Sequence, residues 1–279
     1  MFEAGLLAGK KILVTGGGTG LGAAMGERFS ELGAELVICG RRREILDETA
    51  RRMGERTGGK VTAIQCDVRD PERVEAMMDE IWRSGPLAVL VNNAAGTFLA
   101  RTESLSHRAV DAVLSTTLNG ALYCTIGAGR RWIAARAKGA VLSILSPSTI
   151  TGKAFTVPSA IAKSGLLAMT RSLAVEWGAK GIRLVAIAPG LFPTPGAWER
   201  LIPGERDKAG GPAERIPLGR VGEHPELANL AAYLVSDQAA YITGEMIVID
   251  GGSHLRTSGA EDLLSWSDQQ WEELRRKRK

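Results

Sequence analysis

The sequence predicts an α/β fold: a single doubly wound domain with a seven-stranded parallel sheet and helices on both of its faces. The first observation is that short runs rich in β-branched residues alternate with longer segments whose apolar residues recur at helical spacing. The second is that no linker or internal repeat interrupts this alternation. Because parallel strands are joined through helices that cover the sheet, the pattern favours one layered domain.

The expected elements follow in chain order. Strands are expected at residues 11–15, 35–39, 61–66, 87–91, 140–145, 182–187 and 246–249. Helices are expected at residues 21–32, 42–56, 71–82, 109–135, 158–177 and 225–235. Residues 191–222 carry five prolines and are expected to form a long loop region over the substrate, because long loops in compact domains are usually functional.

The domain is expected to occupy residues 1–252, and an extension follows at residues 253–279. In the extension, Ser267 and Gln270 have the spacing of a capping box, which predicts the start of a terminal helix. The last five residues are all basic and suit the negative pole of that helix. They also account for the net charge of +4, so no nucleic-acid partner is expected.

Composition narrows the class of protein further. Apolar residues make up 44% of the 279 residues and charged residues 24%, as in soluble globular proteins. Cys39, Cys66 and Cys124 stand apart from one another, which favours buried thiols in a reducing cytoplasm and no metal site. No apolar run reaches the roughly 18 residues that a membrane span needs, and the N-terminus has no signal-peptide core. We therefore expect a cytoplasmic protein with no membrane span.

A glycine-rich turn, TGGGTGLG from Thr15 to Gly22, follows the first expected strand and opens the first expected helix. Glycine permits a tight turn at residue 16, close approach of the backbone to a pyrophosphate at residue 20, and close helix packing at residue 22. Free N–H groups at the helix start attract phosphate. This context predicts a Rossmann-type nucleotide site, and a purely structural turn is the alternative. The residues expected to contact the cofactor are Gly16, Gly18, Thr19, Gly20, Leu21 and Gly22.

The end of the second expected strand distinguishes the two nicotinamide cofactors. An NAD enzyme has an acidic residue there for the ribose hydroxyl. In this chain, residues 39–43 read Cys-Gly-Arg-Arg-Arg and offer no carboxylate. A 2′-phosphate would relieve the repulsion between these cations and the positive helix end, and arginine binds phosphate well. We expect NADP(H), bound by Arg41 with Arg42 beside it; the alternative is a solvated basic turn.

Pro158 can begin a helix on which Ser159 and Lys163, at positions i and i+4, share one face. With the glycine turn, this layout resembles the short-chain dehydrogenase/reductase family, in which a Tyr-x-x-x-Lys pair supplies an acid and positions the cofactor. Here serine replaces the tyrosine. The resemblance covers nearly the whole chain and implies a homotetramer that pairs through this helix. It implies further cofactor contacts at Asp67, Val68, Asn93, Lys163, Pro189, Gly190 and Thr194, and catalytic roles for Asn119, Ser146, Ser159 and Lys163.

The missing tyrosine restricts the chemistry. Reduction of a carbonyl must protonate a developing alkoxide, and an aliphatic hydroxyl is a far poorer acid than a phenol. Reduction of a conjugated C=C bond in a thioester instead delivers charge into an enolate, which nearby donors stabilise. Loss of the tyrosine is therefore less damaging to C=C reduction than to C=O reduction.

Within the family, the chain is most similar to the 2,4-dienoyl-CoA reductases, in residues 63–71, 92–98, 118–120, 157–165, 173–178 and 226–234. Those enzymes also replace the tyrosine, commonly by serine, and their mitochondrial form has a substitute tyrosine where this chain has Ser148. The resemblance implies NADPH-dependent reduction of a 2,4-dienoyl-CoA or 2-enoyl-CoA in fatty-acid β-oxidation, with a 3-enoyl-CoA as the product from a diene. It implies substrate contacts at Arg69, Phe98 and Arg200, where the arginines suit CoA phosphates or are ordinary surface residues.

Several possibilities stay open. With neither tyrosine present, the thioester can be polarised by Asn119, Ser146, Ser148, Ser159 or an ordered water. Two other functions are a carbonyl reductase of the 3-ketoacyl type, using serine and water, and a non-catalytic NADP-binding protein. Retention of Asn119, Ser146 and Lys163 argues against the non-catalytic alternative.

Overall fold

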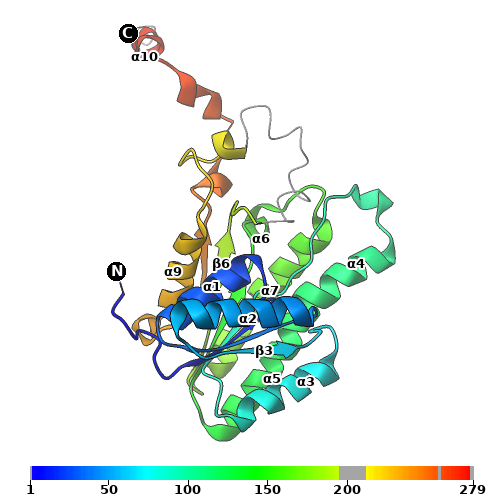
Figure 1. Cartoon of the computed structure of the whole chain (residues 1–279). Helices are drawn as coiled ribbons and strands as arrows, with labels where there is room; N and C mark the ends of the chain where they lie inside the picture. The colour runs from blue at the N-terminus through cyan, green and yellow to red at the C-terminus, as the bar shows by residue number, and fades with distance from the viewer. Residues whose placement is uncertain (1, 195–211, 257–258, 277–279) are drawn as a thin grey trace.

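The computed structural model describes residues 2–194, 212–256 and 259–276. Within them, seven parallel strands form one sheet in the order β3-β2-β1-β4-β5-β6-β7 (Figure 1). The strands are β1 (Lys11–Thr15), β2 (Glu35–Gly40), β3 (Val61–Gln65), β4 (Val89–Asn92), β5 (Gly139–Ile144), β6 (Ile182–Pro189) and β7 (Met246–Ile249). The strand order reverses between β1 and β4, and such a switch point opens a crevice at the carboxyl ends of the strands. The predicted doubly wound fold is confirmed.

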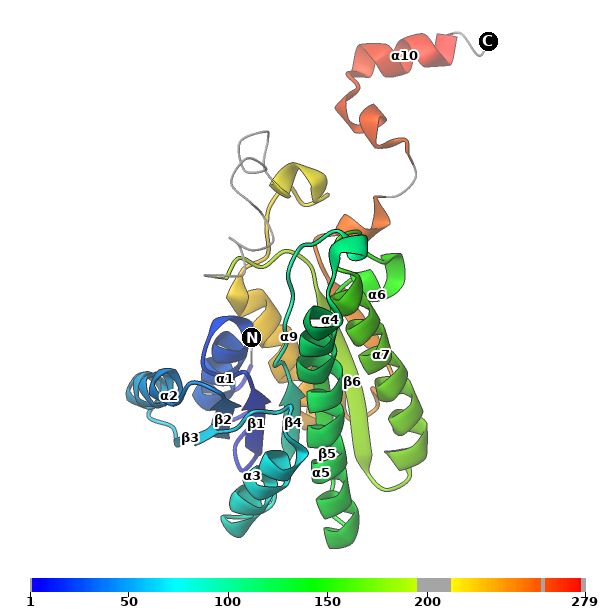
Figure 2. The same cartoon turned by 90° about the vertical axis from the view of Figure 1, so that its right-hand side faces the viewer.

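Helices cover both faces of the sheet because its strands are apolar on both sides. The α-helices of the described residues are α1 (Gly20–Glu31), α2 (Arg43–Thr57), α3 (Pro71–Arg83), α4 (His107–Leu114), α5 (Gly120–Ala135), α6 (Ser148–Thr151), α7 (Val157–Gly178), α9 (His224–Val235) and α10 (Asp268–Arg276), of which α10 lies away from the sheet in the C-terminal extension (Figure 1). Ile12 and Val14 face one core cluster with α1, α2 and α9, whereas Leu13 faces another with α3, α5 and α7 (Figure 2). This alternation along one buried strand is the period-2 pattern of extended chain.

The predicted boundaries differ from the observed ones mainly in the fourth expected helix. Instead of one regular helix over residues 109–135, the chain forms α4, a π-helical turn at Ser115–Asn119, and α5. One extra residue per turn hardly disturbs an apolar pattern, so periodicity does not reveal it. The short helix α6 was also not predicted, because four residues are too few to show a helical period.

Other predictions are confirmed at the level of side chains. Cys39, Cys66 and Cys124 are free and buried, and burial raises the pKa of the Cys66 thiol to about 11. The capping box at the start of α10 is present: the Ser267 N–H donates to Gln270 Oε1 at 2.8 Å, and the Gln270 N–H donates to Ser267 Oγ at 3.4 Å. Among the described residues, no helix has the length and apolar content needed to cross a bilayer.

Candidate active site

The glycine turn joins β1 to α1 at the carboxyl edge of the sheet. Gly16 and Gly20 have φ values of +66° and +56°, which other residues rarely adopt. A Cβ at Gly22 would lie 2.4 Å from Asn93 Nδ2 and 2.5 Å from the Gly16 oxygen, so only glycine fits there. Thr19, the N-cap of α1, makes no side-chain cap, and the first turn holds no acidic residue. The N–H groups at this helix start are therefore available to a phosphate.

Two side chains from neighbouring strands hold the turn in shape. The Asn93 amide donates from Nδ2 to the Thr15 oxygen at 2.9 Å and to the Gly16 oxygen at 3.3 Å. Thr15 Oγ1 accepts from the Asn93 and Ala94 N–H groups, each at 3.0 Å. Asn93, expected as a cofactor contact, therefore holds the backbone of the glycine turn through these hydrogen bonds. On the other side of the turn, Thr194 lies so that a Cβ at Gly20 would be 3.4 Å from its Cγ2.

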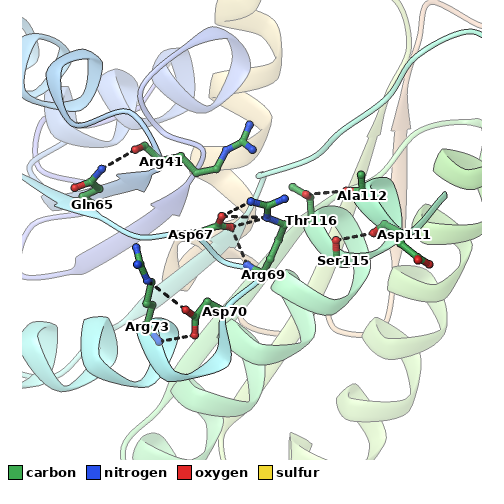
Figure 3. A network of polar contacts seen from close by, with 10 residues as sticks. All are labelled: Arg41, Gln65, Asp67, Arg69, Asp70, Arg73, Asp111, Ala112, Ser115 and Thr116. Carbon is green, nitrogen blue, oxygen red and sulfur yellow. Dashed lines mark hydrogen bonds and ion pairs between the residues drawn. The ribbon is translucent and has the colours of Figure 1, made fainter. Parts of the chain in front are cut away.

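A group of cations lies at the ends of β2 and β3 (Figure 3). Arg41 and Arg42 are exposed, and neither has an acidic partner among the described residues, whereas Arg43 pairs with Asp47 at 2.7 Å. Arg69 forms an ion pair with Asp67, with contacts from 2.5 to 3.0 Å. The hydrogen bonds from Arg69 lower the pKa of the Asp67 carboxyl, and the charge of Arg41 contributes less. In Figure 3, Arg41 extends toward the same region as this pair.

The catalytic candidates gather at the end of β5. Lys163, on α7, is 7% exposed and donates from Nζ to the Ile144 oxygen, at the last residue of β5. Burial lowers the pKa of its ammonium group to about 8. Two residues past Ile144, the Ser146 and Ser148 hydroxyls hydrogen-bond to each other. Ser159 is half-buried one turn before Lys163 on α7.

Asn119 is the last residue of the π-helical turn. Such turns frequently occur at functional sites. Two contacts fix this turn: the Gly96 N–H donates to Thr117 Oγ1 at 3.1 Å, and Gly120 lies so close to Val68 that a Cβ would be 2.6 Å from Val68 Cγ2. The turn thus joins the loop after β4 to the loop after β3.

The remaining site residues fall in different places. Phe98 is half-buried in the loop after β4, and Pro189 ends β6. The Gly190 N–H donates to the Ile249 oxygen at 2.9 Å, and a Cβ at Gly190 would be 2.4 Å from Asp250 Cβ. Asp250 was not among the site residues predicted from the sequence. Arg200 lies outside the described residues.

The arrangement as a whole fits a nicotinamide dinucleotide. The uncapped start of α1 suits a pyrophosphate, and the unpaired arginines after β2 suit a further phosphate. The buried ammonium group of Lys163 lies past the switch point, at the end of β5, where a ribose–nicotinamide moiety would reach.

Comparisons with known proteins agree with this geometry. Residues 16–254 match the model of a family described as enoyl-(acyl carrier protein) reductase. A probable 2,4-dienoyl-CoA reductase of Caenorhabditis elegans, described as (3E)-enoyl-CoA-producing, is 40% identical over 96% of this chain and 89% of its own length. A probable 2,4-dienoyl-CoA reductase of Bacillus subtilis, described as (2E)-enoyl-CoA-producing, is 40% identical over 88% of this chain and 97% of its own. A crystal structure of a short-chain dehydrogenase from Bacillus anthracis superposes with a TM-score of 0.81, 38% identity, and coverage of 89% of this chain and 98% of the other.

Proposed function

Because this chain belongs to the short-chain dehydrogenase/reductase family of oxidoreductases, we propose that it reduces a conjugated C=C bond in an acyl-CoA thioester with NADPH. The substrate is a 2,4-dienoyl-CoA, or a 2-enoyl-CoA, of fatty-acid β-oxidation. The observation that carries the proposal is a buried lysine that donates to the last residue of β5, shortly before the bonded hydroxyls of Ser146 and Ser148, with serine instead of a phenol at both tyrosine positions, 148 and 159. The names of the C. elegans and B. subtilis relatives support the same substrate class.

The cofactor supplies a hydride when bound. Its pyrophosphate would rest on the N–H groups of residues 20–22 at the start of α1, and Thr194 would lie close by. Arg41 would hold the 2′-phosphate, with Arg42 beside it, because both are exposed and lack acidic partners in the described chain. Asp67 and Val68 would border the adenine, and Pro189 and Gly190 the nicotinamide. Lys163 would bind the nicotinamide ribose and add positive charge near the reacting atoms.

The substrate oxygen requires donors rather than a strong acid. As hydride reaches the far end of the diene, negative charge spreads into a thioester enolate. The hydroxyls of Ser146, Ser148 and Ser159 and the amide of Asn119 are the donors in this part of the chain. The Ser146–Ser148 hydrogen bond places two of these hydroxyls together at the end of β5. Phe98, Arg69 and Arg200 would contact the acyl-CoA, and Arg69 would then have to share its guanidinium with Asp67.

We also propose a cytoplasmic homotetramer, in which subunits pair through α7. Its support is the small-residue face of Ala160, Ser164 and Ala168 on this helix, of which Ser164 and Ala168 are exposed and Ala160 is half-buried.

Two alternative functions, a carbonyl reductase and a non-catalytic NADP-binding protein (the binding-only alternative), are distinguished from the proposed one by the following assay.

One assay tests the proposal. NADPH oxidation by the purified protein is measured separately with 2,4-dienoyl-CoA, 2-enoyl-CoA and 3-ketoacyl-CoA. We expect rapid oxidation with the dienoyl-CoA or the enoyl-CoA and little with the ketoacyl-CoA. Rapid reduction of the ketoacyl-CoA with no reduction of the dienoyl-CoA or the enoyl-CoA would contradict the proposed function. NADPH binding without any turnover would favour the binding-only alternative.

A further inference from the structure

A histidine–carboxylate pair lies directly after β7, outside the groups discussed so far. Asp250 Oδ2 accepts a hydrogen bond from His254 Nδ1 at 2.9 Å. The Asp250 side chain is 2% exposed and that of His254 is 19% exposed. With Nδ1 committed to the carboxylate, the other ring nitrogen, Nε2, takes no hydrogen bond from any described residue. The pair therefore presents one oriented, free ring nitrogen.

Asp250 also shapes the turn that carries the histidine. Its carboxylate accepts from the Gly252 N–H at 2.9 Å and from the His254 N–H at 2.8 Å. Gly251 and Gly252, with φ values of +64° and +86°, reverse the chain so that residue 254 returns over the carboxylate. Asp250 thus holds His254 both by its imidazole ring and by its backbone N–H.

The pair lies at the carboxyl edge of the sheet, two strands from the catalytic candidates at the end of β5. Strands β5, β6 and β7 are neighbours, and Pro189 pairs with Ile249, the residue before Asp250. Gly190, next to the expected nicotinamide, touches Asp250 through its backbone. In Figures 1 and 2, the orange segment after β7 lies at the same end of the sheet as α6. Two strand spacings, about 10 Å, separate the ends of β5 and β7.

The turn is also tied to the expected substrate loop. The Leu218 N–H donates to the Gly251 oxygen at 3.2 Å, and Arg256 Nη1 donates to the Glu214 oxygen at 2.7 Å. A Cβ at Gly252 would be 3.1 Å from Pro217 Cγ. The turn that carries His254 therefore contacts both Gly190, through Asp250, and the part of residues 191–222 that the structure describes.

We propose that His254, oriented by Asp250, is the proton donor that this chain uses in place of the missing tyrosines. The inference rests on the proposed function. A C–H bond of the reduced nicotinamide breaks, NADPH becomes NADP⁺, and the hydride forms a C–H bond at C5 of the dienoyl-CoA. The electron pair displaced from the diene is then delocalised over C4, C2 and the thioester oxygen. The imidazolium Nε2–H bond breaks, and its proton forms a C–H bond with that electron pair at C2, which leaves a C3=C4 double bond. The neutral imidazole regains a proton from water.

This assignment has a consequence for the product. Protonation at C2 yields a 3-enoyl-CoA, whereas protonation at C4 yields a 2-enoyl-CoA, so the location of the acid selects the isomer. A single positioned donor should produce one isomer, and solvent without a positioned donor should produce both. The experiment therefore measures the ratio of isomers as well as the rate.

The test compares wild type, His254→Gln, Asp250→Asn and the control His107→Gln, which changes an exposed histidine on α4. We expect His254→Gln to lower the rate of product formation on the order of 10²-fold and to convert one product isomer into a mixture. His107→Gln should match wild type in both respects. Asp250→Asn should have an intermediate effect, since the imidazole keeps its place but loses the carboxylate.

Binding and spectroscopy separate a chemical role from a structural one. Calorimetry should give similar affinities of wild type and His254→Gln for the 3-enoyl-CoA product. In ¹⁵N-histidine-labelled wild type, this product should shift the Nε2 resonance of His254 and leave that of His107 unchanged, a result that does not require the variant to fold. An unchanged rate and isomer ratio in His254→Gln, or no response of the His254 resonance, would overturn the proposal while dienoyl-CoA reduction by wild type stood. No dienoyl-CoA reduction by wild type would overturn the proposed function, and this role with it.

Discussion

The two halves of the carboxyl edge are built in different ways. At the ends of β1 and β4, the backbone makes the site: glycines at positive φ and close approaches that no side chain fits, such as Gly22 against Asn93. At the ends of β5, β6 and β7, side chains make the site: Lys163 against a strand carbonyl, a pair of serines, and an aspartate–histidine pair. The first half, where we propose that the nucleotide binds (the nucleotide half), should therefore tolerate few substitutions. The second half, where we propose that catalysis occurs (the catalytic half), can exchange one donor for another and keep its shape.

The largest effect should come from the lysine of the catalytic half. Lys163→Ala should reduce turnover on the order of 10³-fold, because it removes both a ribose contact and a buried positive charge. Ser159→Ala should keep a measurable fraction of activity, since an aliphatic hydroxyl is a weak acid. Steady-state kinetics with saturating NADPH measure both, and Lys180→Ala, an exposed lysine, is the control. Complete loss of turnover in Ser159→Ala with intact cofactor binding would show that the serine has a direct role.

In the nucleotide half, the largest loss of stability or cofactor binding should come from adding a side chain at a glycine of the turn. Gly22→Ala forces a Cβ to within 2.4 Å of Asn93 Nδ2, which should cost about 3 kcal/mol of stability or of NADPH binding. Gly54→Ala in α2 is the matched control, since its Cβ would meet nothing closer than 3.5 Å. Thermal melts with and without NADPH measure the two variants. Equal behaviour of both would mean that the turn tolerates the side chain.

A pH experiment measures the burial of the lysine without any substrate. In the folded protein the pKa of Lys163 is about 8, whereas in the unfolded chain it is about 10.4. Between these values the unfolded chain binds more protons, so this residue makes the cofactor-free protein more stable as pH rises from 8 to about 10.4, and its destabilising effect is fully present below pH 8.

The difference in unfolding free energy between wild type and Lys163→Met, from denaturant titrations, should therefore shift in favour of wild type by about 2 kcal/mol from pH 7 to pH 10. Other titrating groups cancel in this difference. A pH-independent difference would mean that the lysine is hydrated in solution.

The smallest expected effect concerns the choice of cofactor. Arg41→Ala should weaken NADPH binding about tenfold, through the loss of one charge-assisted phosphate contact, and leave NADH binding nearly unchanged. Arg43→Ala is the control because that arginine already pairs with Asp47. If Arg41→Ala weakened the binding of NADPH and NADH equally, Arg41 would not be the residue that binds the 2′-phosphate.

Sequence patterns predicted the nucleotide half better than the catalytic half, because the first depends on local backbone geometry and the second on contacts made by the folded chain. The strands, the glycine turn and the capping box at Ser267 depend on local periodicity and backbone geometry, which are visible in one stretch of chain. The π-helical turn before Gly120 is hidden because one inserted residue leaves the apolar pattern nearly intact. The pairing of Asp250 with His254 depends on how two glycines turn the chain after β7, and periodicity carries no such information.

The central claim is that the catalytic half transfers hydride to a C=C bond conjugated to a thioester and not to a carbonyl. The most direct test is a competition in which NADPH deuterated at the transferring position meets equal concentrations of 2,4-dienoyl-CoA and 3-ketoacyl-CoA, and mass spectrometry and NMR locate the label. We predict deuterium at C5 of an enoyl-CoA, with little in 3-hydroxyacyl-CoA. Deuterium found mainly at C3 of 3-hydroxyacyl-CoA would contradict the claim.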